Sequence, residues 1–280
     1  MKVEQIWVYP VKSMIGGQVP AAAVDERGIV GDRTWATRDE ERGGIRGAKK
    51  IGELMQFAAR YTAAPGGEVE ITCPDGATLL TSDADCDERL SKALDHRVTL
   101  WPLQPADQLD HYRRGPADSD DVMEELRGIF GRDADEPLPD FSVFPPEIVE
   151  FESPPGTYLD AFPIMFMSTS ALRALEAALP DSAGGDVRRY RPSFVVDTGD
   201  EPGHPELTWK GRHLRVGSAE LEILDPCPRC VMVTRRIDDD ATQDRAVLRH
   251  IVRELDQNVG AYARVAVPGT FAVGDPVTLV

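Results

Sequence analysis

Residues 224–234 read Leu-Asp-Pro-Cys-Pro-Arg-Cys-Val-Met-Val-Thr, and this stretch predicts more about the chain than any other. It holds Cys227 and Cys230, two of the four cysteines, with an arginine between them. Residues 214–224 upstream read as a strand, and residues 231–234 are again β-prone. Two prolines fix φ and remove backbone donors, so we expect both cysteines on a short rigid loop or bulge between strands. A thiol beside a guanidinium is readily held as a thiolate, the form that soft metals bind.

The two cysteines are open to four interpretations. A structural zinc site needs four ligands, usually as two close pairs, but Cys73 and Cys86 lie far upstream and no histidine pair is near. A thioredoxin-like redox pair begins a helix in a βαβ unit, whereas β-type sequence follows here. The third interpretation is two buried or idle cysteines in a strand turn. The fourth is that one of the cysteines ligates a metal cofactor whose other ligands do not come from the protein. The last interpretation requires a pocket for that cofactor.

Composition and charge exclude several classes of protein. A chain of 280 residues can bury a large core, as one β-rich domain or as two domains. The net charge of −17 argues against nucleic acid as a partner, because phosphate binding needs a basic surface. No apolar run reaches the roughly 20 residues of a membrane span, and the N-terminus begins in a strand pattern without a signal peptide. Four cysteines in so long a chain form no disulfide framework, so we expect a cytoplasmic protein.

The order of short apolar runs indicates a mainly β fold with a few short helices. The chain has 24 glycines and 22 prolines, which separate these runs. The predicted strands are residues 1–12, 19–24, 33–37, 68–72, 77–81, 97–100, 164–167, 193–196, 214–224, 262–267 and 276–280. The predicted helices are residues 87–94, 119–130, 168–179 with Thr169 as a plausible cap, and 245–256. Residues 104–156 are acidic and proline-rich, and we expect a long loop or lid over the surface.

Basic residues at strand ends are conspicuous in this acidic chain. Lys12 and Ser13 end the first strand, Arg33 begins another, Arg191 precedes a strand, and Arg229 separates the two cysteines. Each alone is typical of a solvated charge or a structural ion pair. Together with a thiolate they indicate a dianionic ligand such as a phosphate, which arginine binds bidentately.

Five short motifs follow one another in a family-specific order. They are Tyr-Pro-Val-Lys-Ser (9–13), Gly-Asp-Arg-Thr-Trp (31–35), Tyr-Arg-Pro (190–192), Cys-Pro-Arg-Cys (227–230) and Gly-Asp-Pro-Val (274–277). In this combination the chain resembles the MOSC family, in particular its two-part members, among them the mitochondrial amidoxime-reducing component and its bacterial relatives. The resemblance covers nearly the whole chain and is weakest over residues 104–150. It implies a mainly β fold: an N-terminal MOSC-associated β-barrel domain (1–103), a connecting segment (104–156) and a MOSC-type β-barrel domain (157–280).

The resemblance also implies a cofactor and the residues that hold it. The cofactor would be a molybdenum-pyranopterin, whose metal is bound by dithiolene sulfurs and by one protein cysteine, which falls on Cys230. Lys12, Ser13, Arg33 and Arg191 match positions that hold the pterin and its phosphate. Arg229 flanks the metal ligand, and Tyr262, Ser168 and Thr169 fall where the family has polar groups near the pterin.

Three functions follow from the resemblance and stay open. The first is a molybdenum-dependent oxidoreductase that reduces N-hydroxylated or N-oxygenated small molecules by two electrons. The electrons would come from a separate donor such as a ferredoxin, a flavodoxin or a cytochrome b5-like reductase system, because we expect no iron–sulfur domain here. The second is a carrier of the molybdenum cofactor or of persulfide sulfur, without pyridoxal phosphate or desulfurase activity. The third is a structural or protein-binding domain with a decayed site.

Overall fold

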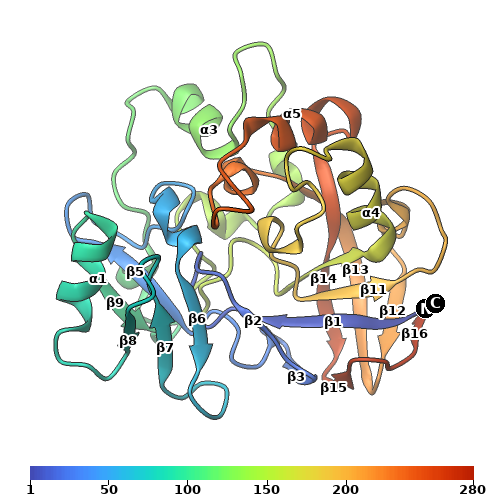
Figure 1. The fold of residues 1–280 in the computed structure, drawn as a ribbon, viewed down its shortest axis with the longest axis horizontal. Coiled ribbons are helices and arrows are strands. Elements are labelled where there is room, and N and C mark those ends of the chain that lie inside the picture. Colours follow the sequence, from blue (N-terminus) through green and yellow to red (C-terminus); the bar gives the residue numbers. More distant parts are fainter.

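A large curled sheet dominates the fold, and Figure 1 shows it in the computed structural model, which describes residues 1–280. Its strand order is β16 (Val277–Leu279), β12 (His213–Val216), β13 (Ala219–Pro228), β14 (Asn258–Val267), β10 (Ile164–Ser168), β11 (Phe194–Asp197), β1 (Lys2–Val8) and β2 (Gly17–Gln18). Three small sheets are β15 (Gly269–Ala272) with β3 (Ala21–Asp25) and β4 (Gly28–Ile29), β5 (Trp35–Asp39) with β9 (Val98–Pro102), and β6 (Ala58–Tyr61) with β7 (Val69–Thr72) and β8 (Thr78–Leu80). The prediction of a mainly β fold is confirmed.

Five α-helices cover the sheets. They are α1 (Cys86–Leu94), α2 (Leu109–Tyr112), α3 (Val122–Phe130), α4 (Thr169–Ala178) and α5 (Arg245–Glu254). In Figure 1, α1 lies with the two small sheets β5–β9 and β6–β7–β8 on one side of the molecule, while α4 and α5 lie on the other side, where α4 contacts β11 and α5 contacts β14. None of the helices is both long and apolar enough to cross a bilayer.

The first strand belongs to the sheet that the C-terminal half otherwise forms. β1 pairs antiparallel with β11, with Val3 opposite Val196 and Ile6 opposite Phe194. These side chains are fully buried in one apolar cluster, and their burial fixes the register because a one-residue slip would turn them outward. The pairing carries residues 9–13, which follow β1, to the part of the chain that holds the two cysteines.

A shared core joins the two halves of the sequence. Val11 and Leu54 are buried in the same apolar cluster as Met232 and Ile237, and the half-buried Cys230 packs against it. The N-terminal and C-terminal parts are therefore not independent modules in this structure. The division at residues 103 and 157 stays a prediction.

The connecting segment is folded against the C-terminal part rather than lying loosely over the surface. The Asp121 carboxylate caps α3 by accepting from the backbone N–H of Met123 at 2.8 Å. Beyond α3, the Arg249 guanidinium of α5 pairs with Asp133 at 2.7 Å and with Glu136. Short 3-10 turns follow at residues 141–143 and 146–149.

Four local predictions are wrong, each for a physical reason. Residues 214–224 form the hairpin β12–β13 instead of one strand, because Gly217 turns the chain at a φ of +55°. Residues 231–234 form a 3-10 turn after Cys230, since a run of three apolar residues and a threonine fits a strand or a buried turn equally well. Ser168, not Thr169, caps α4 and accepts from the backbone N–H of Ala171 at 3.0 Å. Residues 269–272, which lie between the predicted strands 262–267 and 276–280 and were not predicted as a strand, form β15 because they pair with β3.

Candidate functional site

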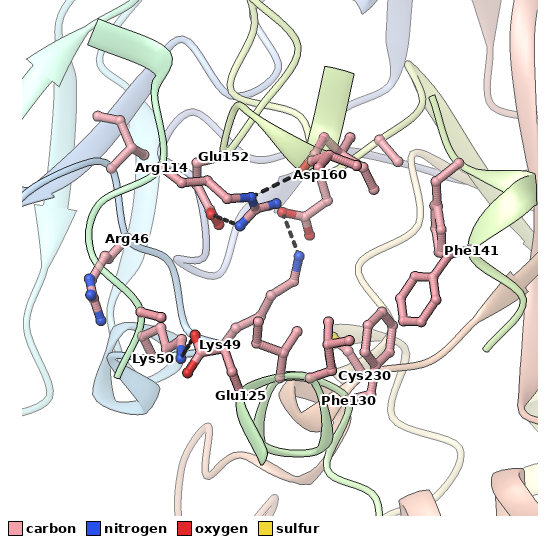
Figure 2. Close-up of a pocket in the computed structure, with 18 of the residues that line it drawn as sticks. Arg46, Lys49, Lys50, Arg114, Glu125, Phe130, Phe141, Glu152, Asp160 and Cys230 are labelled. Atoms are coloured by element: carbon pink, nitrogen blue, oxygen red, sulfur yellow. Dashed lines mark hydrogen bonds and ion pairs between the residues drawn. The ribbon is translucent and has the colours of Figure 1, made fainter. Parts of the chain in front are cut away.

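A cavity of about 500 Å³ lies at the junction of the N-terminal part, the connecting segment and the cysteine loop. Figure 2 shows Cys230 on its wall beside Phe130, with the charged groups of Lys49, Asp160, Arg114 and Glu152 facing the hollow. The other residues on the wall include Arg46, Lys50, Glu125, Phe141, Phe144, Pro228 and Tyr262. The connecting segment supplies much of this wall, so it helps to form the candidate site.

The two cysteines of the loop have different surroundings. Cys227 lies in β13, is 3% exposed, and accepts a hydrogen bond from Arg229 Nη1 at 3.1 Å. Burial raises the pKa of the Cys227 thiol, and the nearby Arg229 guanidinium only partly offsets this rise. Cys230 is half-buried, precedes the 3-10 turn and borders the cavity. Only Cys230 of the pair is therefore available to a ligand in the cavity.

Three residues hold the backbone between the cysteines. The backbone N–H of Arg229 donates to the carbonyl of Gln257 at 2.9 Å, and the carbonyl of Arg229 accepts from Arg132 Nη2 at 3.0 Å. The Arg229 side chain donates to the carbonyl of Tyr190 at 2.7 Å. Burial alone would lower the pKa of Arg229, but the neighbouring Cys227 and Tyr262 outweigh this effect. The pKa of Arg229 is therefore raised, and its side chain stays charged. The loop is thereby fixed from both sides, and Cys230 keeps one position at the cavity wall.

A group of charges connects the cavity with the buried layer beneath it. Lys12 is 4% exposed, and its ammonium donates to the carbonyl of Tyr158 at 3.0 Å and to the Asp160 carboxylate at 2.6 Å. Lys49 Nζ lies 3.4 Å from the same Asp160 oxygen. Desolvation alone would raise the pKa of Asp160, but Lys12 and Lys49 hold it well below its usual range. The carboxylate is therefore ionised at neutral pH.

Two arginines approach one aromatic ring behind this group. The guanidinium carbons of Arg33 and Arg191 lie 5.3 and 4.3 Å from the centroid of the Tyr9 ring. Arg33 also pairs with Asp32, whereas Arg191 bonds only to the carbonyl of Met14 through Nη1. Burial, followed by repulsion from Arg33, lowers the pKa of Arg191 to about 10. This guanidinium is thus buried without a carboxylate partner.

Backbone strain is concentrated at the same place. Seven non-glycine residues have a positive φ, and Ser13, Arg33 and Arg191 are three of them, at 70°, 51° and 57°. Side chains other than glycine rarely adopt this region, and such conformations cluster at ligand sites where the surrounding structure enforces them. Gly47 packs closely against this strained segment, since a Cβ at this position would lie 2.5 Å from Ser13 Oγ.

The buried layer fits an anionic ligand. Arg191 Nη2 is buried and has no hydrogen-bond partner, an arrangement that needs an explanation in a folded protein. The basic side chains of this region carry more positive charge than Asp32 and Asp160 neutralise. They are Lys12, Lys49, Arg33, Arg191 and Arg229. A phosphate would satisfy the free guanidinium N–H groups with charge-assisted hydrogen bonds. No three histidine, cysteine or acidic side chains lie together, so a metal at Cys230 would need ligands from outside the protein.

The structure brings most of the predicted site residues together, in two layers. Cys230 and Tyr262 line the cavity. Five more predicted residues lie beneath the cavity and contact cavity residues or the neighbours of those residues: Lys12, Ser13, Arg33, Arg191 and Arg229. Ser168 and Thr169 lie elsewhere: Ser168 Oγ donates to the buried Glu206 at 2.6 Å, and Thr169 accepts from the backbone N–H of Thr198 at 3.2 Å. Neither lines the cavity.

Lys49 and Asp160 are cavity residues that the sequence reading missed. Asp160 stands alone between Tyr158-Leu159 and Ala161-Phe162, and an isolated acid in an apolar run is a usable signal. Lys49 follows the turn at Gly47, where no predicted strand ends, so the criterion used for the strand-end basic residues does not find it. Their importance depends on contacts across more than a hundred positions, which local patterns do not reveal.

Two family models match the chain in order. The model described as the MOSC N-terminal beta barrel domain matches residues 1–112, and the model described as the MOSC domain matches residues 154–278. The chain belongs to the MOSC family. In this MOSC protein the N-terminal match contains Lys12, Ser13 and Arg33, and the C-terminal match contains Arg191 and Cys230. The candidate site therefore draws on both matched regions.

Curated relatives of this MOSC protein are distant but span nearly its whole length. Mitochondrial amidoxime reducing component 2 of Bos taurus is 24% identical over 98% of this chain and 82% of its own. Mitochondrial amidoxime-reducing component 1 of Homo sapiens is 25% identical over 99% and 82%. The solved structure of the YUAD protein from Bacillus subtilis aligns over 99% of this chain and 94% of that chain, at 12% identity and a TM-score of 0.43.

Proposed function

We propose that this protein binds a molybdenum-pyranopterin cofactor and reduces N-hydroxylated or N-oxygenated small molecules with electrons from a separate redox protein. The observation that carries the proposal is one half-buried thiol at a cavity wall, with a buried cationic layer that Asp32 and Asp160 neutralise only in part and in which Arg191 Nη2 has no partner. The full-length similarity to two amidoxime-reducing components supports the same substrate class.

Each part of the site has a role in this proposal. Cys230 supplies the one protein ligand to the metal, and Arg191 and Arg33 hold the phosphate through their free N–H groups. Lys12 and Lys49 position Asp160, which faces the cavity with 45% of its side chain exposed. When bound, the cofactor supplies two-electron chemistry with oxygen-atom transfer, while the protein orients it and excludes water.

The proposal is tested with an anaerobic assay and a cofactor analysis on the same preparation. Protein expressed in cells that make the cofactor is analysed for molybdenum and pterin, and is then mixed with an artificial reductant and benzamidoxime. We expect benzamidine to form in proportion to molybdenum content, and the Cys230→Ala variant to form none. Molybdenum-loaded protein that does not reduce benzamidoxime or other N-hydroxylated compounds would overturn the proposed reaction.

A carrier function is the second candidate, and the accessibility of Cys230 favours it. Cys230 opens to the cavity and lies near Lys49 and Arg132. A persulfide on this thiol would therefore be accessible and surrounded by positive charge. Intact mass spectrometry separates the two candidates: a mass increase of one sulfur without pterin supports the carrier, and bound pterin with turnover supports the reductase.

A further inference from the structure

The cavity has a charged side and an apolar side. The charged side holds Lys49, Asp160, Arg114 and Glu152, and in Figure 2 these groups point toward one another across the hollow. The apolar side comes from the connecting segment and consists of Val122, Ile129, Phe130, Phe141, Phe144 and Val149. Figure 2 shows Cys230 beside Phe130, on the apolar side of the hollow.

Three phenylalanines form the centre of the apolar side, and we call them the Phe wall. The ring centroids of Phe130 and Phe141 are 5.6 Å apart, those of Phe130 and Phe144 are 6.5 Å apart, and those of Phe141 and Phe144 are 6.4 Å apart. Phe130 ends α3, and the other two belong to or follow the 3-10 turn at residues 141–143. Rings at these spacings can accept a further planar group in an offset or edge-to-face arrangement.

The Phe wall does not serve the core of the protein. Neither α3 nor the two 3-10 turns beyond it contain a buried residue, and none of the three rings belongs to a buried apolar cluster. Val122 is 69% exposed, Phe141 42% and Val149 82%. So much exposed apolar surface around one cavity indicates a binding function, because folding gains little from it.

The Phe wall also does not suit the phosphate end of a pterin. A phosphate needs hydrogen-bond donors and positive charge, and the cations that supply them lie under the opposite side, around Lys12 and Arg191. Beside the apolar side, Lys50 is already paired with Glu125 and with Asp118 at 2.8 Å. The volume of about 500 Å³ is within the range of small-molecule sites.

We propose that the Phe wall is the substrate-specificity surface of this site and binds the planar apolar group of an aromatic N-hydroxylated substrate, such as an arylamidoxime. The inference rests on the proposed function, which requires the N-oxygenated group of the substrate to reach the side of Cys230. An aryl ring against Phe141 and Phe144 leaves the polar end directed toward Cys230 and the charged side. The substrate class is therefore neutral and aromatic rather than small and polar.

The first measurement is binding without turnover. Benzamidoxime and acetamidoxime are titrated into the purified protein in the absence of reductant, and binding is followed by ligand-observed NMR. We expect benzamidoxime to bind at least tenfold more tightly than acetamidoxime. Phe141→Ser and Phe144→Ser should each weaken benzamidoxime binding by roughly three- to tenfold, because each removes apolar contact surface from the Phe wall. Phe141→Leu should keep most of the affinity, and Val267→Ser, an exposed apolar residue outside the cavity, should keep all of it.

The second measurement separates the inference from the proposed function. With reductant present, the Phe141→Ser variant should raise the KM for benzamidoxime while kcat and molybdenum content stay unchanged. Benzamidoxime binding that depends on the Phe wall, without turnover, would support the inference and overturn the proposed reaction. Turnover with equal affinity for both amidoximes, or with no effect of either serine variant, would overturn the inference and leave the proposed reaction standing.

Discussion

The ammonium group of Lys12 lies 2.6 Å from the carboxylate of Asp160, although the two residues are 148 positions apart. Lys12 is buried, whereas Asp160 opens to the cavity with 45% of its side chain exposed. Burial lowers the pKa of Lys12, and Asp160 partly restores it. The pair therefore connects the buried cationic layer with the wall of the cavity.

Asp160→Asn should lower the free energy of unfolding at pH 7 by about 1–2 kcal/mol. The substitution leaves the Lys12 ammonium buried without its carboxylate, but the carbonyl of Tyr158 and the Ser153 hydroxyl still accept from it. The double variant Lys12→Met with Asp160→Asn should recover most of the loss, because no buried charge remains. Urea denaturation measures both effects. Glu222→Gln, which breaks the exposed pair with Arg264, is the matched control and should cost less than 0.5 kcal/mol.

The cost of Asp160→Asn should also depend on pH. The folded-state pKa of Asp160 lies well below 3.8, so its stabilising contribution is complete above the unfolded-state pKa of about 3.9. This stabilising contribution is lost as the pH falls from the unfolded-state pKa through the folded-state pKa. The reason is that the carboxylate of Asp160 binds a proton at a higher pH in the unfolded state than in the folded state. Between pH 5 and 8 the difference between wild type and Asp160→Asn should be constant, and below pH 4 it should shrink. A difference that grows on acidification would contradict the assignment.

Arg191→Gln should abolish stabilisation of the protein by sulfate or phosphate. An anion that binds the folded state raises the melting temperature in proportion to the logarithm of its concentration over its Kd. In the wild type, sulfate should raise the melting temperature above that in chloride at equal ionic strength, and Arg191→Gln should not respond. Occupancy by the pterin cofactor should fall by roughly one to two orders of magnitude. Arg60→Gln removes the same charge from an exposed pair and should respond like the wild type.

Local patterns predicted the strands and the residues whose chemistry is intrinsic, but not the contacts between distant segments. The apolar alternation around Val3 and Ile6 is visible in the sequence, yet their pairing with β11 depends on the whole sheet. Cys230, Arg33 and Arg191 could be identified because motifs carry them. Lys49 and Asp160 were not identified, because neither lies in a motif and their importance arises from the 3.4 Å contact between them. Ser168 was predicted as a site residue because the resemblance to the MOSC family implied a polar contact there, but its hydroxyl is occupied by Glu206 and by the start of α4.

The contact between α5 and the connecting segment should control the mobility of the cavity wall. Arg249 pairs with Asp133 and Glu136 and also donates to the carbonyl of Gly131. Arg249→Met removes these contacts and leaves Glu136, which is 7% exposed, with the longer pair to Arg253 at 3.5 Å. Hydrogen exchange of residues 131–149 should become faster by roughly ten- to a hundredfold, since a lost charged contact is worth about 1.5–3 kcal/mol of local stability. Arg264→Met, at an exposed pair on the large sheet, should leave exchange in this segment unchanged.

The two cysteines of the loop should respond in opposite ways to the same substitution. Cys230→Ala removes a half-buried thiol at the cavity wall, so the free energy of unfolding should change by less than about 0.5 kcal/mol while the molybdenum content of the purified protein falls to background. Cys227→Ala leaves the buried Arg229 Nη1 without its sulfur partner, so the free energy of unfolding should fall by about 1–3 kcal/mol. The molybdenum content of that variant should stay nearer to wild type. Metal analysis and urea denaturation of the two variants give the answer together. If Cys227→Ala loses the metal and Cys230→Ala retains it, the ligand has been assigned to the wrong cysteine of the pair.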